Sequence, residues 1–290
     1  MSRAIEPMSA MMPDPTPSIP DALARLNQPD QLTRLQIAQR VLERWPPDAA
    51  TRLVETGLDS QHPRVRAESA RLAGQLAMRR RLPGLARCGA RLEELARDVG
   101  QPGRVRKSAV WSLGWIGAPE SLAAIEALSQ HDNAMYRRAA VEAAGRLGGV
   151  EAAAVLLRGL TDPAWQVRMD AAIGLGGLPG EVAAASYEAL VAALRDEPHP
   201  KAAEQMLRSL PEVAPAASRS DEAIGVLLAR LDDHGEARVS RAAARGLGEL
   251  ADAVTNPEAL LAELQRRERA ASAQVAAALR WSLMALRTRE

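Results

Sequence analysis

Six short stretches of the sequence superpose on one position, which is glycine in five of them and methionine in the sixth. The aligned residues are Gly74, Gly114, Gly145, Gly176, Gly248 and Met284. They are separated by 40, 31, 31, 72 and 36 residues, and the interval of 72 has room for two repeats. A period in the thirties is typical of an array of helix pairs, each of which buries its apolar face against its neighbours. The repeat therefore predicts an elongated, all-α molecule and excludes most enzyme folds.

The buried side of each aligned helix follows from its apolar positions. We number each helix from the residue nine before its aligned position, so that the helices start at Val65, Val105, Tyr136, Val167, Val239 and Val275. Positions 0, 4, 8 and 11 are then almost always apolar, and at 3.6 residues per turn they lie within roughly 80° of one another. Positions 5 and 9 are mostly Ala, Val or Gly, which suits close approach by the next repeat. In the last unit they are Arg280 and Met284, as expected for a capping repeat.

Breaks rich in Pro and Gly separate these helices from their partners. We expect the partner helices over residues 48–58, 83–98, 119–129, 150–160, 181–195, 221–232 and 257–268. The unit around residues 196–215 has no glycine to mark its register, so we expect a bend or irregularity there. Residues 1–20 contain five prolines and little periodic pattern, which predicts a disordered tail before a repeat domain over residues 21–290.

Two copies of the repeat, residues 128–148 and 160–178, carry a turn Asp, an Arg near the start of the second helix, an Ala-Ala pair and a small residue near its end. This pattern resembles the HEAT-like repeats first noted in phycobilisome lyase subunits, over about residues 30–290. The resemblance implies a right-handed α-solenoid of about seven HEAT-like helix pairs. It also implies a ladder of Asp and Arg between successive repeats. The matching residues are Asp132, Asp162, Asp233, Arg66, Arg106, Arg137 and Arg168.

Charge is distributed unevenly along the chain. The net charge is only +1, but residues 62–107 contain twelve basic and four acidic residues. Such a stretch supports nucleic acid as an alternative partner, held through phosphate contacts.

The sequence contains no recognisable catalytic constellation. The single Cys88 excludes an intrachain disulfide, and no His or Cys residues have the spacing of a metal site. A P-loop is absent as well. We therefore expect a non-enzymatic protein with no cofactor and no metal. Without a signal-peptide pattern or a long apolar run, we also expect a cytoplasmic location and no membrane partner.

The candidate binding site is a tryptophan pair on the side of a second helix that faces away from the core. Trp111 and Trp115 lie one turn apart, with Lys107 beside them. In HEAT stacks the second helices line the concave surface, and Trp and Arg dominate the hot spots of protein interfaces. The predicted partner-binding residues are Arg71, Lys107, Trp111, Trp115, Arg138, Glu142 and Arg146.

These features predict a scaffold or adaptor that binds another protein on its concave face. Two alternatives stay open: a nucleic-acid-binding HEAT-like protein that uses residues 62–107, and a lyase-subunit-like chaperone for cofactor attachment, which the resemblance implies. For the tryptophan pair itself the alternative is structural, with both rings packed on the N-terminal segment or on the helix over 82–98.

Overall fold

The structure is a computed structural model that describes residues 17–117, 121–231 and 237–287. Throughout these ranges the regular structure is helical and contains no strand. The α-helices are α1 (Ile19–Leu26), α2 (Gln31–Arg44), α3 (Pro47–Leu58), α4 (Pro63–Arg80), α5 (Gly89–Arg97), α6 (Gly103–Ile116), α7 (Leu122–Ser129), α8 (Ala134–Leu147), α9 (Gly149–Gly159), α10 (Trp165–Gly176), α11 (Ala183–Arg195), α12 (Pro200–Val213), α13 (Ser220–Leu231), α14 (Ala237–Glu249), α15 (Pro257–Ala270) and α16 (Ala273–Arg287). Short 3-10 helices are η1 (Pro83–Cys88), η3 (Gly180–Val182) and η4 (Leu250–Ala253).

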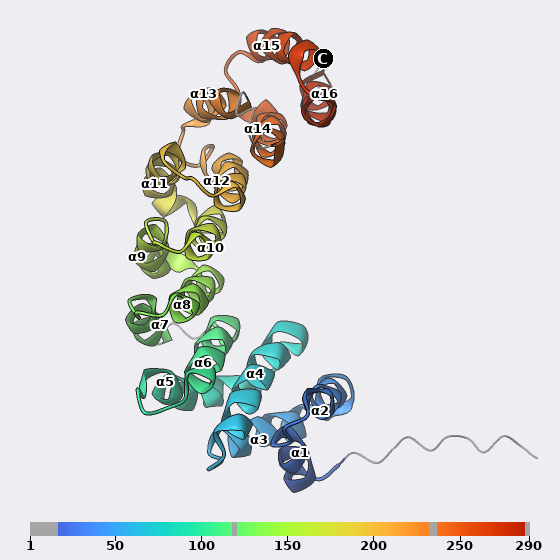
Figure 1. Cartoon of the computed structure of the whole chain (residues 1–290), viewed down its shortest axis with the longest axis vertical. Coiled ribbons are helices and arrows are strands. Elements are labelled where there is room, and N and C mark those ends of the chain that lie inside the picture. The colour runs from blue at the N-terminus through green and yellow to red at the C-terminus, as the bar shows by residue number, and fades with distance from the viewer. Residues whose placement is uncertain (1–16, 118–120, 232–236, 288–290) are drawn as a thin grey trace, which may run out of the picture.

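The helices form two rows in a curved stack (Figure 1). From α3 onward the odd-numbered helices lie in the outer row and the even-numbered helices in the inner row, so the even-numbered helices line the concave side. The fold is thus the right-handed α-solenoid that the repeat predicted. In the described part of the chain, seven helix pairs run from α3/α4 to α15/α16, after α1 and α2.

Most of the expected tail, residues 1–16, lies outside the described residues. Helix α1 begins at Ile19, within the last residues of the expected tail. Pro20 lies in the first turn of α1, where a missing N–H removes no helical hydrogen bond. Ser18 caps this helix by accepting a hydrogen bond from the backbone N–H of Asp21.

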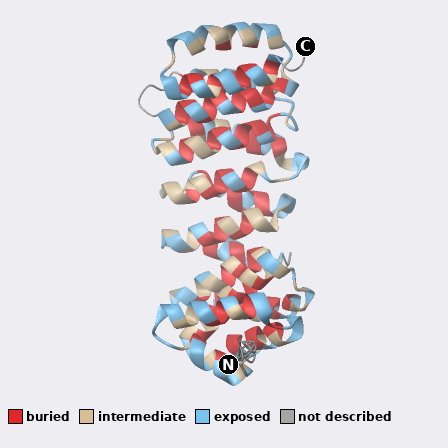
Figure 2. Ribbon diagram, turned by 90° about the vertical axis from the view of Figure 1, so that its right-hand side faces the viewer, coloured by how far each residue is buried: buried red, intermediate tan, exposed pale blue. Residues whose placement is uncertain are grey.

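The core is built from the predicted apolar positions 0, 4, 8 and 11 of each aligned helix, which we call the core stripe. Buried residues recur in helix after helix along the stack (Figure 2). All stripe positions of the six aligned helices are buried except four, which are partly buried and still pack against the core: Ile116, Tyr136, Leu147 and Leu178. Trp45 and Tyr187, the other large aromatic residues of the core, are almost fully buried.

The recurring glycines let successive inner helices approach closely. A Cβ atom on Gly114 would lie 2.6 Å from the Cα atom of Ala143 in the next inner helix, and one on Gly145 would lie 2.9 Å from the Cα atom of Gly174. Real side chains do not tolerate such distances from backbone atoms. The glycine at position 9 is therefore required by its contact with position 7 of the following unit.

The unit around residues 196–215, which has no marker glycine, packs on its neighbours through the same helix positions as the other units. The expected bend or irregularity is not seen in this packing. In α12 the core stripe starts at Ala202, and Pro211 takes the place of the glycine, close to Gly246 of the next inner helix. The Ser209 hydroxyl donates to the Ala172 carbonyl oxygen at 2.8 Å. Serines at the same position of α6 and α16 make the equivalent bond, Ser112 to Ala70 and Ser282 to Ala244.

Candidate functional site

The tryptophan pair lies between α4 and α8 on the inner row. The ring centroids of Trp111 and Trp115 are 6.1 Å apart with an edge-on geometry, and both side chains are partly buried. The Trp111 ring rests on Gly74 of α4, where an added Cβ atom would come within 2.4 Å of the indole. Because Gly74 has no side chain, the Trp111 ring can pack directly on the backbone of α4.

Arg146 of α8 covers this pair. Its guanidinium carbon lies 4.5 Å from the ring centroid of Trp115 and 5.9 Å from that of Trp111. Glu142, one turn earlier, accepts a hydrogen bond from Arg146 at 2.6 Å and fixes the guanidinium in place. Four predicted site residues thus form one unit, which we call the aromatic cluster: Trp111, Trp115, Glu142 and Arg146.

Two hollows flank the cluster. The first, which we call the N-terminal hollow, has a volume of about 380 Å³. It contains the predicted residues Arg71, Lys107 and Trp111, together with Arg104. The Nε atom of Arg71 forms an ion pair with the Glu68 carboxylate at 2.9 Å. Lys107 is exposed and has no ion-pair or hydrogen-bond partner within the described ranges.

The second hollow lies beside residues of the 82–98 segment that the structural alternative names. It is lined by Trp115, Met78 and the segment that leads into η1, including Leu82 and Leu85. The Nε1 atom of Trp115 is buried and has no hydrogen-bond partner among the described residues. Trp115 therefore lies between Arg146 on one side and this hollow, which borders α4 and η1, on the other.

Arg138 does not join the aromatic cluster. Its Nε atom pairs at 2.6 Å with Asp170 of α10, a buried carboxyl. Burial raises the pKa of Asp170, and the hydrogen bond and charge of Arg138 oppose that rise. The site therefore divides into a cluster on α6 and α8 and a separate ion pair between α8 and α10.

The predicted ladder is present at two steps. Arg137 makes two hydrogen bonds to Asp162 of the next turn, at 2.6 and 2.8 Å. Arg168 makes two to Glu197, both at 2.6 Å, so a glutamate replaces the expected aspartate. Asp132 takes part only through its carbonyl oxygen, which accepts from Arg137. Asp233 lies outside the described residues.

The remaining two ladder arginines find other partners. The Nε atom of Arg66 donates to the side chain of Gln101 at 3.0 Å. Arg106 donates to the Ala96 carbonyl oxygen and lies over the Tyr136 ring, 5.5 Å from its centroid. At these steps the ladder therefore lacks a carboxylate.

The basic stretch over residues 62–107 is largely engaged within the molecule. Eight of its twelve basic side chains hydrogen-bond to or pair with other residues of the chain. Within the described residues no such partner is found for Arg79, Arg81, Arg104 and Lys107. Since nucleic-acid affinity depends on arginines that reach phosphates, this arrangement gives the nucleic-acid alternative little support.

Sequence reasoning missed a second aromatic site at the other end of the inner row. Trp281 of α16 is 43% exposed and rests on Gly248, as Trp111 rests on Gly74. Arg245 of α14 lies 5.8 Å from its ring centroid. The sequence does indicate this site, because Trp281 and Trp111 both occupy position 6 of their helices.

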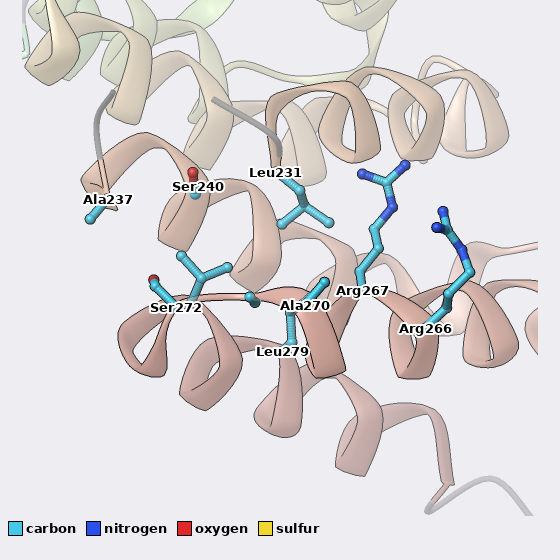
Figure 3. Close-up of a pocket in the computed structure, with 10 residues that line it drawn as sticks. Leu231, Ala237, Ser240, Arg266, Arg267, Ala270, Ser272 and Leu279 are labelled. Atoms are coloured by element: carbon cyan, nitrogen blue, oxygen red, sulfur yellow. The ribbon is translucent and has the colours of Figure 1, made fainter. Parts of the chain in front are cut away.

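Another hollow, shown in Figure 3, separates α14 from the last helix pair. Arg266 and Arg267 extend from α15 toward the preceding pair (Figure 3), and Arg267 donates to the Leu228 carbonyl oxygen at 3.0 Å. Both arginines also bond to Glu263 of their own helix, and the bond from Arg267 to Leu228 joins the last two pairs.

In the described ranges no three His, Cys, Asp or Glu side chains gather as they would around a metal ion. Each helix described here is too short or too polar to cross a lipid bilayer.

Comparison with known proteins agrees with this architecture. The sequence pattern of HEAT repeats matches residues 90–176. YibA of Escherichia coli has a similar structure, with a TM-score of 0.63, 16% identity and 92% of each chain covered. A mutant of Kap121p gives a TM-score of 0.55 and 13% identity over 92% of this chain and 33% of its own.

The complex of CpcE and CpcF of phycocyanin lyase from Nostoc sp. gives a TM-score of 0.49 and 15% identity, over 84% of this chain and 95% of the other. No curated protein matches the sequence significantly. All these identities are too low to carry a function from one protein to another, whereas the YibA and Kap121p structures resemble this one in fold. The chain has the architecture of a HEAT-like repeat protein.

Proposed function

We propose that this protein is a non-enzymatic scaffold that binds another protein on its concave face, with the aromatic cluster as the anchor. The observation that carries the proposal is a partly buried Trp pair, covered by Arg146 and bordered by two hollows, on the inner row of a rigid stack. Trp and Arg provide most of the binding free energy at protein interfaces, particularly where they are already ordered before binding.

The N-terminal hollow fits this proposal. Lys107 and Arg104 are exposed at its rim, and the Trp111 ring forms one wall. An apolar side chain of the partner would pack against Trp111, and an acidic neighbour would meet Lys107. Arg71 is less available because Glu68 already holds it.

The experiment is an affinity pull-down from a lysate of the source organism, with and without nuclease. The Trp111→Ala/Trp115→Ala variant removes the anchor. Lys107→Glu alters only an exposed charge and preserves folding. Trp165→Ala is the matched control, since this tryptophan stacks on His199 at a turn, 3.8 Å between ring centroids, and lies apart from the cluster.

The proposal predicts a protein that is recovered after nuclease treatment by the wild-type chain and by Trp165→Ala. The Trp pair variant should lose it, and Lys107→Glu should retain less of it. Equal recovery by all four chains would contradict the proposal. Recovery of nuclease-sensitive material alone would favour the nucleic-acid alternative.

A further inference from the structure

The concave face carries another hollow at its C-terminal end, which we call the C-terminal hollow. It is formed by α12, α14 and α16 and has a volume of about 410 Å³. Its lining is Glu204, Arg208, Arg238, Arg241, Ala242, Arg245, Ala278 and Trp281. Two alanines and an indole ring therefore form its apolar part, and four arginines surround it.

Positive charge exceeds negative charge around this hollow. Glu204 is shared by two arginines, at 2.7 Å from Arg208 and 3.0 Å from Arg238. Arg245 pairs with Glu249 at 2.9 Å. Arg241 is exposed, and its Nε atom donates to a carbonyl oxygen of its own helix at 3.2 Å. Within the described residues it has no carboxylate partner, so four arginines face two carboxylates.

The aromatic wall of this hollow is held in place before any ligand arrives. An added Cβ atom on Gly248 would lie 2.5 Å from the Trp281 ring, so the indole rests directly on the backbone of α14. The neighbouring Ser282 hydroxyl donates to the Ala244 carbonyl oxygen and fixes the contact between the two helices. An exposed ring ordered in this way loses little conformational entropy on binding.

The N-terminal hollow and the C-terminal hollow are built from the same helix positions. Trp111 and Trp281 occupy position 6 of their helices, and an arginine occupies position 6 of the inner helix before each, Arg71 and Arg245. The C-terminal hollow differs in its cations, because it has four arginines where the N-terminal hollow has two arginines and Lys107.

We infer that the C-terminal hollow binds an acidic segment of a partner protein, with a carboxylate at Arg241 and an adjacent apolar side chain on Trp281. Charge complementarity selects this occupant. Glu204 and Glu249 lie among the arginines and would repel a continuous phosphate backbone, whereas a single carboxylate needs only one or two guanidinium groups. This site is separate from the aromatic cluster and does not depend on it.

The test measures the binding of a short fluorescein-labelled peptide, in which glutamates surround one leucine, to the full chain by fluorescence anisotropy. A peptide with lysines in place of the glutamates and a labelled single-stranded DNA are the comparison probes. The variants are Arg241→Glu, Trp281→Ala and Lys107→Glu. Arg52→Glu, an exposed arginine of the outer helix α3, is the matched charge control.

We expect the acidic peptide to bind more tightly than the lysine peptide and the DNA. Arg241→Glu and Trp281→Ala should each weaken its affinity by about tenfold. Arg52→Glu and Lys107→Glu should leave the affinity within about twofold. Three results would overturn the inference: an unchanged affinity in Arg241→Glu, a loss confined to Lys107→Glu, or tighter binding of the DNA. The Trp111→Ala/Trp115→Ala variant should still bind the peptide, so a failure of the proposed function is seen separately.

Discussion

At the scale of single residues, the stack is held by contacts that cross from one repeat to the next. Asp162 shows how these contacts work, because it accepts two bonds from Arg137 and one from the Ala164 N–H. Burial raises the pKa of Asp162, but these hydrogen bonds and the charges of Arg137 and Arg168 outweigh burial and bring the pKa below its usual value. The ionised carboxylate therefore stabilises the folded chain.

The first prediction concerns Asp162→Asn. Because the folded pKa is lowered, the stabilisation is complete above the unfolded pKa of about 3.9 and is lost as the pH falls through the folded value. At neutral pH the variant should lose about 2 kcal/mol of unfolding free energy, and the loss should shrink below about pH 4. Urea unfolding at several pH values measures this. Asp132→Asn is the control, because that carboxylate has no bond among the described residues. A loss that stays constant with pH would contradict the account.

At the scale of elements, close approach between inner helices depends on small residues at two positions. In Gly114→Ala the new methyl group would meet the backbone of α8 at 2.6 Å, and backbone cannot move aside as a flexible side chain can. We expect a loss of about 1–3 kcal/mol in unfolding free energy. Gly225→Ala in α13 is the matched control, since no atom lies within 4 Å of its added Cβ. That substitution should gain up to about 1 kcal/mol from helix propensity. Equal stability of the two variants in thermal melts would show that the approach of α6 and α8 is not tight.

Most elements were predictable from sequence, because each repeat presents its own apolar stripe and its own breaks. The helix expected over 83–98 is instead η1 followed by α5, an interruption for which the sequence signal is Pro83 with Gly84 and Gly89. The register of α12 was hidden by Pro211 in place of a glycine.

The candidate site was predictable only in part. Helix periodicity places Trp111 and Trp115 together. The position of Arg146 over them depends on the offset between α6 and α8, that is, on how far one helix is shifted along the other. The pairing of Arg138 with Asp170 depends on the next offset, between α8 and α10, in the same way. Offsets between helices are set by packing in three dimensions, which a single sequence does not reveal.

At the scale of the whole molecule, a solenoid has no single centre, so its stability varies along the stack. The last outer helix, α15, buries only Leu260 and Leu264, whereas α9 in the middle of the outer row buries five residues. Met284 of α16 is 59% exposed. Of the described outer helices from α3 onward, α15 buries the fewest residues, so we expect the pair of α15 and α16 to open before the pairs in the middle of the stack.

Native-state hydrogen exchange measures this gradient. The amides of α15 and α16 should exchange at a lower opening free energy than those of α8, α10 and α12. Uniform protection from α8 to α16 would instead indicate that the array unfolds as one cooperative unit.

The concave face is the surface on which the proposed function depends, and its anchor is the aromatic cluster. The most direct measurement is the affinity of the recovered protein partner, by isothermal titration calorimetry, for the wild-type chain, Trp111→Ala/Trp115→Ala and Trp165→Ala. Circular dichroism establishes that all three chains are equally helical. We predict that the Trp pair variant loses about 2 kcal/mol or more of binding free energy while Trp165→Ala binds as the wild type does. Equal affinity of the Trp pair variant and the wild type would contradict the account.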